Sequence, residues 1–195
     1  TVESDVTAGG RGIAIFRSSD GTASGTKPIN TLVKGNADGC DYGVNYTHCG
    51  HGHEVFINIR NHIRCMYNTG TSGVSGIINS VKGGGADLNL STRGGGEIVD
   101  IDMIYHGISP NQAIELKVED STAANITNIK ISGAVRGCVN DSIVITTLGH
   151  VDTVVENIDF SDLRVINSTG NGIDILPDVA ATISNIKLGD FQSQL

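Results

Sequence analysis

Short runs in which apolar and polar residues alternate recur along the chain, and this repetition restricts the fold more than any other feature. One type of run is EIVDIDMIYHG at 97–107, and related segments start at Pro28, Glu54, Val74, Ile126, Val155 and Ile183. Their central apolar residues are Leu32, Ile57, Ile77, Ile101, Ile129, Ile158 and Ile186. Self-similarity at intervals of roughly 20–50 residues is typical of repeat architectures.

A second type of run precedes each of these segments. Its members are GIAIF, YGVNYT, RCMYNT, ADLNLS, AIELKV, SIVIT and NGIDIL. Period-two alternation turns one face of each strand inward, and stacked coils bury that face in a continuous core. A Greek-key sandwich is the alternative, but it predicts hairpin signals between successive runs. The ordered alternation of two run types favours a parallel β-solenoid of about seven coils, with Ile101, Ile129, Ile158 and Ile186 stacked in one column.

The composition agrees with an all-β domain covering 1–195. The chain has 26 Gly, only 3 Pro and 4% aromatic residues, which suits short strands joined by tight corners. A net charge of −8 and a pI near 5.0 argue against a nucleic-acid partner. The sequence contains no run of about 18 apolar residues, so it predicts no membrane-spanning helix. Because the chain starts at Thr1 without an initiator Met or a signal peptide, we expect it to be a fragment of a longer protein.

Cysteine and histidine could indicate disulfides or a metal site. Cys40, Cys49, Cys65 and Cys138 match no CxxC spacing, so we interpret them as buried free thiols, with a Cys40–Cys49 bridge as the competing interpretation. The segment THCGHGHEV at 47–55 brings three histidines close together, but its spacing fits no common zinc motif. We therefore predict a polar turn, no metal and no cofactor. If His51 has a role, acid–base chemistry or glycan binding is favoured.

Asparagine occupies a repeated position in three of the long runs. Asn128, Asn157 and Asn185 each come immediately before the central isoleucine of their run. Stacked amides can hydrogen-bond from one coil to the next and support a turn. We predict a structural asparagine ladder at one corner of the solenoid.

The rhythm of GVSGIINSVKGGGADLNLSTRGGGEIVDIDMIY, residues 73–105, resembles the pectin-lyase-like superfamily. That group includes polygalacturonases, pectate lyases and bacteriophage tailspike or appendage proteins. Gly50-His51-Gly52 matches one polygalacturonase motif, but Leu88-Asn89-Leu90 stands where an Arg-Ile-Lys is expected, and no Asp-Asp pair occurs. The chain is therefore closest in character to tailspikes. The resemblance implies a single-stranded right-handed parallel β-helix, a homotrimer, a polysaccharide ligand, and a place in the virion or outside the cell.

A candidate site follows from the faces of the shorter runs. We assign inward positions to Ile13/Ile15, Val44/Tyr46, Cys65/Tyr67, Leu88/Leu90, Ile114/Leu116, Ile143/Ile145 and Ile173/Ile175. Asp87 and Glu115 then face outward as a diagonal pair on neighbouring strands, about 7–8 Å apart. This separation falls within the range of roughly 6.5–9.5 Å for inverting glycosidases. The expected substrate-binding residues are Asn89, Lys117, Arg93, Arg64 and His51. The alternative is a solvated surface on which Asp87, Glu115 and Lys117 neutralise one another.

Three functions fit the sequence. The first is a tailspike-type domain that recognises, and in an active form hydrolyses, a bacterial surface polysaccharide. The second is a secreted polysaccharide hydrolase or lyase. The third is a non-catalytic adhesive or structural β-helix. An active protein would be an inverting two-carboxylate glycoside hydrolase or a polysaccharide lyase.

Overall fold

The computed structural model describes residues 2–7, 10–16, 29–92, 96–119, 124–148, 153–177 and 181–193. These residues form strands and turns and contain no helix, so none of them lies in a helix that could cross a membrane. One sheet consists of β1 (Val2–Thr7), β3 (Leu32–Asp38), β5 (His53–His62), β7 (Val74–Gly83), β9 (Ile98–Ile108), β11 (Asn125–Arg136), β13 (Val154–Ser168) and β15 (Thr182–Ser193). The other consists of β2 (Arg11–Phe16), β4 (Tyr42–Thr47), β6 (Arg64–Thr69), β8 (Ala86–Ser91), β10 (Gln112–Val118), β12 (Ile143–Thr147) and β14 (Ile173–Leu176).

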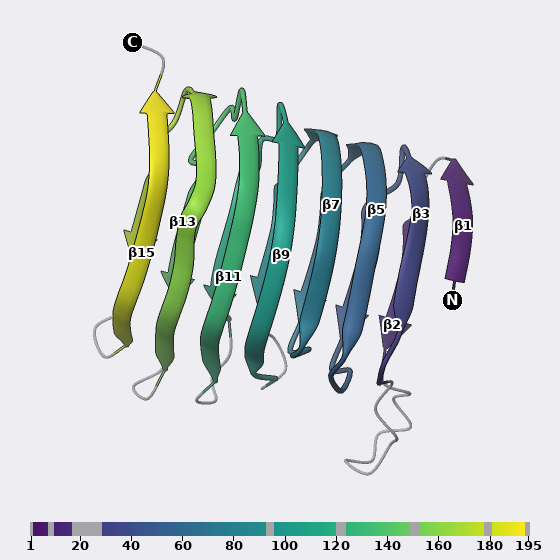
Figure 1. Cartoon of the computed structure of the whole chain (residues 1–195), viewed down its shortest axis with the longest axis horizontal. Helices are drawn as coiled ribbons and strands as arrows, with labels where there is room; N and C mark the ends of the chain where they lie inside the picture. Colours follow the sequence, from purple (N-terminus) through teal and green to yellow (C-terminus); the bar gives the residue numbers. More distant parts are fainter. Residues whose placement is uncertain are drawn as a thin grey trace.

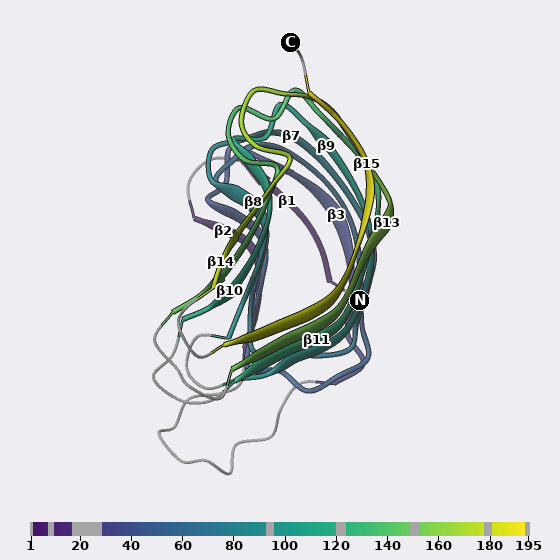
Figure 2. The same cartoon turned by 90° about the vertical axis from the view of Figure 1, so that its left-hand side faces the viewer.

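After β1 and β2, successive strands alternate between the two sheets, and each new strand pairs in parallel with the strand two positions earlier. The eight-stranded sheet runs in order from β1 to β15 (Figure 1), and the seven-stranded sheet runs from β2 to β14. Viewed along the long axis, the two sheets face each other across a common interior (Figure 2). The predicted all-β class with parallel strands is therefore confirmed, and the arrangement is compatible with a β-solenoid.

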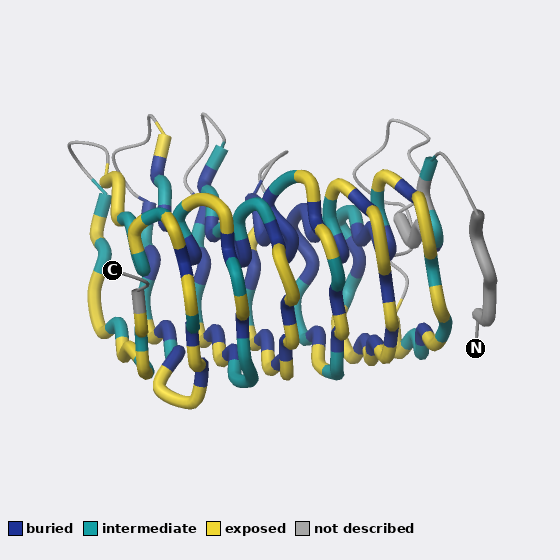
Figure 3. Tube along the Cα trace, turned by 90° about the horizontal axis from the view of Figure 1, so that it is seen from above, coloured by how far each residue is buried: buried dark blue, intermediate teal, exposed yellow. Residues whose placement is uncertain are grey.

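The core lies between the sheets and is built from columns of matching side chains. Ile101, Ile129, Ile158 and Ile186 are paired in register in β9, β11, β13 and β15, as predicted. The first three are buried, and Ile186 in the edge strand is half-buried against the same core. Buried and exposed positions alternate along β5 (Figure 3). This pattern follows from the alternation of side chains across a strand.

The inward column of the seven-stranded sheet is mostly as predicted. Its buried members include Ile13, Val44, Tyr46, Leu88, Leu90, Ile114, Leu116, Ile143 and Ile145. At the last strand, Ile173 is half-buried and Ile175 is 39% exposed. The side chain of Ile15 lies outside the described residues.

The predicted register of β6 is wrong by one residue. Met66, rather than Cys65, pairs with Val44 and Leu88, while Asn68 pairs with Tyr46 and Leu90. The interior accepts Asn68 because its amide is satisfied there: Nδ2 donates to the Thr71 carbonyl at 2.8 Å, and Oδ1 accepts from the Thr71 N–H at 3.0 Å. Tyr67 consequently points outward.

Several residues at the corners adopt the left-handed backbone conformation. Asn128, Asn157 and Asn185 have φ between 52° and 57°, a region that asparagine and glycine tolerate best. Their side chains form the predicted ladder: Asn185 donates to Asn157, and Asn157 donates to Asn128. The ladder extends one coil further, because Asn128 donates to Asp100 at 3.0 Å and Asp100 has a φ of 58°.

All four cysteines are free and buried, as predicted. Cys40 and Cys49 are not bridged, so the competing interpretation of a disulfide is wrong. Burial raises the pKa of the Cys40 and Cys138 thiols above their ordinary value. They therefore behave as small apolar side chains within the core.

Candidate functional site

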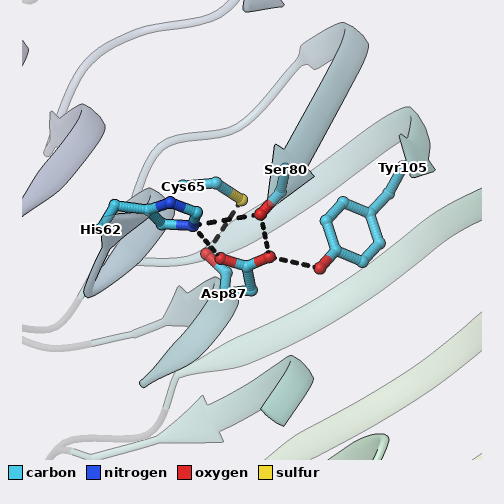
Figure 4. A network of polar contacts seen from close by, with 5 residues as sticks. All are labelled: His62, Cys65, Ser80, Asp87 and Tyr105. Atoms are coloured by element: carbon cyan, nitrogen blue, oxygen red, sulfur yellow. Dashed lines mark hydrogen bonds and ion pairs between the residues drawn. The ribbon is translucent and has the colours of Figure 1, made fainter. Parts of the chain in front are cut away.

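A buried polar network surrounds Asp87 at the junction of the two sheets. The carboxylate accepts a 2.5 Å hydrogen bond from the Tyr105 hydroxyl and a short one from the Ser80 hydroxyl, and it also contacts His62 Nε2 (Figure 4). Cys65 Sγ donates to the Asp87 backbone carbonyl at 3.0 Å. The five residues come from β5, β6, β7, β8 and β9, so the network ties both sheets together.

Burial sets the chemistry of this network. Asp87, Cys65 and Tyr105 are 0% exposed, and His62 is only 4% exposed. Burial and the neighbouring Asp87 carboxylate hold the pKa values of Tyr105 and Cys65 well above their ordinary range. Both groups therefore stay protonated, and Tyr105 remains a hydrogen-bond donor to the carboxylate.

Ser80, His62 and Asp87 are residue types used in nucleophilic catalysis, but their geometry differs from a catalytic relay. Such a relay needs the acid on one imidazole nitrogen and the nucleophile on the other. Here Ser80 and Asp87 both contact Nε2 of His62, and Nδ1 is buried without a hydrogen-bond partner among the described residues. Because the group is also closed to solvent, the arrangement indicates a structural role.

The expected outward position of Asp87 is wrong. Its carboxylate points into the interior, where three donors compensate the cost of burying a charge. Glu115 does lie on the outer face of the seven-stranded sheet and is half-buried. The two carboxylates therefore do not share one face of the sheet, and their acid–base roles stay a prediction.

The outer face of the seven-stranded sheet carries a row of polar and aromatic side chains. Asn45, Tyr67, Asn89 and Glu115 are register partners in β4, β6, β8 and β10. The Asn89 amide donates a short hydrogen bond to Glu115, while its Oδ1 is buried without a partner among the described residues. Tyr67 and Glu115 are half-buried, whereas Asn89 between them is only 2% exposed. We call Tyr67, Asn89 and Glu115 the outer row.

Arg64 lies beside the outer row and contacts two tyrosines. Its guanidinium carbon is 5.2 Å from the Tyr67 ring centroid and 5.8 Å from that of Tyr42, and the two rings stack with centroids 5.5 Å apart. Cation–π contacts of this kind orient a guanidinium group over aromatic rings. Within the described part of the chain, Arg64 has no carboxylate within ion-pair distance, and its Nε atom is buried without a hydrogen-bond partner.

The other predicted binding residues are dispersed. Lys117 forms a 2.6 Å ion pair with Glu119, so part of its charge is already neutralised. His51 is exposed in the turn between β4 and β5, where its carbonyl accepts the Asn30 N–H. Arg93 lies outside the described residues. Of the predicted residues, the structure brings together Arg64, Asn89 and Glu115.

The histidines of the segment 47–55 differ in burial: His53 lies in the core and His51 lies on the surface. His53 is buried, its Nδ1 lies 2.8 Å from the Thr31 hydroxyl, and its ring contacts Tyr46 at 5.0 Å. Burial lowers the pKa of His53. His51 is exposed, and the described residues contain no group of three potential metal ligands.

Sequence reasoning missed Tyr67 and Tyr42 on the outer face, and His62, Ser80 and Tyr105 in the interior. A signal for Tyr67 was present: YGVNYT and RCMYNT both end in threonine, and Thr47 pairs with Thr69. Aligning the runs at these threonines places Tyr67 beside Asn45 on the outer face. For the buried network no local signal exists, because its members join only through the fold.

No family model, curated protein or solved structure matches this chain.

Proposed function

We propose that the chain is a right-handed parallel β-helix of about seven coils, similar to those of the pectin-lyase-like superfamily, that recognises a polysaccharide. The ligand is a bacterial surface glycan, as expected for a tailspike-type domain acting in a phage tail or outside the cell. The binding surface is the outer row together with Arg64 and Tyr42. The observation that carries this proposal is the presence of aromatic, amide, carboxylate and guanidinium groups on neighbouring strands of one sheet face.

The chemistry of these groups suits a sugar chain. A carboxylate and an amide accept and donate hydrogen bonds to ring hydroxyls, and a partly exposed tyrosine ring offers an apolar contact. Parallel strands lie about 4.8 Å apart, so the outer row extends along the solenoid as a polysaccharide would.

Recognition without cleavage is favoured, because Asp87 is enclosed in the interior. An acid that protonates a leaving oxygen has to reach the bound substrate. If the protein does cleave its ligand, the original assignment predicts that Asp87→Asn and Glu115→Gln each lower turnover by a factor of about 10² or more. Reducing-end release from the bound polysaccharide measures this, and normal turnover in both variants contradicts the assignment.

Binding to an array of bacterial surface polysaccharides tests the proposal. We expect Tyr67→Ala and Arg64→Gln each to weaken binding to the best ligand about tenfold or more, the effect of losing roughly 1.4 kcal/mol. Lys130→Gln is the matched control, since Lys130 is exposed on the other sheet. Absence of any polysaccharide ligand, or an equal loss in the control, overturns the proposal. An experimental structure tests the hand and the number of the coils.

A further inference from the structure

The outer face of the eight-stranded sheet carries an exposed apolar row that the proposed function does not use. Phe56, Ile77 and Ile104 are register partners in β5, β7 and β9. Phe56 is 36% exposed, Ile104 is 39% exposed and Ile77 is half-buried. Single exposed apolar residues are ordinary, but contiguous ones mark interaction surfaces. We call these three residues the apolar row.

Two rows of different chemistry flank the apolar row. The first flanking row lies two residues earlier in the same strands. It consists of the exposed carboxylates Glu54 and Asp102 and the exposed hydroxyl of Ser75 between them. The second flanking row lies two residues later. It consists of the exposed amides of Asn58 and Asn79 and the exposed imidazole of His106. Residues two apart in a strand share a face, so all nine side chains point outward from this sheet.

The donor side of this surface is ordered by its own hydrogen bonds. Asn79 Nδ2 donates to Asn58 Oδ1 and Asn58 Nδ2 donates to Asn36 Oδ1, each at 2.9 Å. Each amide nitrogen carries a second hydrogen that can be donated outward. On the opposite side, Glu54 and Asp102 form no ion pair within the described ranges. The surface therefore has an acceptor edge and a donor edge with an apolar centre.

We propose that a second copy of this chain packs on the apolar row, related by a two-fold axis parallel to the row. This rotation places each strand opposite the same strand of the partner, in the antiparallel direction. The carboxylate row of one copy therefore faces the amide row of the other. Each apolar residue then meets its own copy, Glu54 meets the partner's Asn58, and Asp102 meets the partner's His106. Lys34 precedes Phe56 in the row, with its Nζ 5.5 Å from the Phe56 ring centroid, and it would face its own copy, so the contact is limited to β5, β7 and β9. An isologous contact requires self-complementarity of this kind. The sheet is convex in Figure 2, which confines the contact to a central strip.

This interface is independent of the proposed glycan surface, which lies on the other sheet. It also differs from the homotrimer expected from the resemblance, because a two-fold axis closes the assembly at two copies. Light scattering across a concentration series distinguishes the outcomes by mass. We expect a dimer near twice 20.3 kDa. A monomer at all concentrations or a trimer overturns the proposal.

Substitution on the axis gives a sharper test. Ile77→Lys places two like charges opposite each other, so we expect the dimer dissociation constant to rise at least tenfold. Val139→Lys is the matched control, because Val139 is apolar and 56% exposed but lies away from the row. An unchanged dissociation constant in Ile77→Lys, with a folded protein by circular dichroism, contradicts the two-fold contact.

Cross-linking tests the same geometry without relying on a destabilising variant. Ile77→Cys is expected to cross-link to itself with a short bismaleimide, while the four native thiols are buried and do not compete. Asp102→Cys mixed with His106→Cys is expected to cross-link faster than either variant alone. Val139→Cys, 56% exposed in the turn after β11 and outside these rows, is the control. Equal cross-linking of the control, or no gain from mixing, overturns the proposal.

Discussion

The hydroxyl of Tyr105 donates a 2.5 Å hydrogen bond to the carboxylate of Asp87, and this bond joins β9 of one sheet to β8 of the other. His62 and Ser80 contact the same carboxylate from β5 and β7 (Figure 4). A buried charge is tolerated only when it is compensated in this way. The network therefore fixes how the two sheets meet near the middle of the molecule.

Asp87→Ala is expected to lower the free energy of unfolding by about 3–5 kcal/mol, because it leaves three buried groups without their acceptor. Tyr105→Phe removes only one hydrogen bond to a charged group and should cost roughly 1.5–3 kcal/mol. Urea unfolding measures both. Asp162→Ala is the control: the Asp162 side chain is 69% exposed, and its removal should change stability by about 0.5 kcal/mol or less. An equal effect in the control contradicts the structural role of Asp87.

Stability is expected to fall in alkali because of Tyr46. Burial raises the pKa of Tyr46 from 10.0 to about 12. The neutral side chain therefore stabilises the fold fully below pH 10, and this contribution is lost as the pH rises from 10 towards 12. At about 1.4 kcal/mol per pH unit, the loss is on the order of 3 kcal/mol. Urea midpoints between pH 8 and 12 measure it, and Tyr46→Phe should reduce the slope. An unchanged slope in Tyr46→Phe contradicts the assignment.

The four thiols are expected to resist modification in the native protein. Burial raises the pKa of the Cys65 thiol well above its ordinary value, and the thiolate is the reactive form. A thiol-reactive dye at pH 8 should label the native protein at least 10²-fold more slowly than the urea-unfolded protein, which should yield four thiols. Fewer than four thiols after unfolding without reductant contradicts the free state of the cysteines.

Substitutions of Asn157 separate the backbone contribution of the ladder from its hydrogen bonds. Asn157 has a φ of 57° and bonds to Asn128 and Asn185. Asn157→Gly keeps the left-handed turn accessible and should cost about 1 kcal/mol. Asn157→Ala adds strain of roughly 1–2 kcal/mol.

Thermal or urea unfolding should therefore show that Asn157→Ala is less stable than Asn157→Gly. Asn79 is the matched control, because it belongs to a second amide ladder but does not have a positive φ. There glycine should be no better than alanine, since glycine weakens a strand. The same ranking at both positions contradicts the assigned role of the left-handed conformation.

The repeating architecture was predictable from local pattern. Strand alternation has a period of two, so the repeated position of Ile101, Ile129, Ile158 and Ile186 in their runs already identified residues that share a face and a register position on neighbouring strands. The asparagine ladder was predictable for the same reason, since one residue type returned at one position of each coil. Both features repeat along the chain, and repetition is visible in a sequence.

The candidate site was only partly predictable. Glu115 and Asn89 were placed correctly on the outer face, but the alternation rule assigned Asp87 to that face and Tyr67 to the interior. Alternation fails at Asp87 because the residue lies near the start of β8, next to a corner, where Gly83 has no side chain: a Cβ at Gly83 would lie 2.5 Å from Asp87 Oδ1, so glycine leaves room for the carboxylate inside. In β6 the alternation holds, but its phase was assigned wrongly, because Asn68 satisfies its amide on Thr71 and can occupy the core position.

By itself, the sequence determined the strands, their alternation between two sheets and the side chains that stack in columns, because each depends on the period of a single strand. Only the tertiary structure decided which polar groups are enclosed. Asp87 is stable inside because Tyr105, Ser80 and His62 arrive from three other strands to donate to it or contact it. The free energy of burying a polar group depends on partners distant in sequence. No local pattern records those partners.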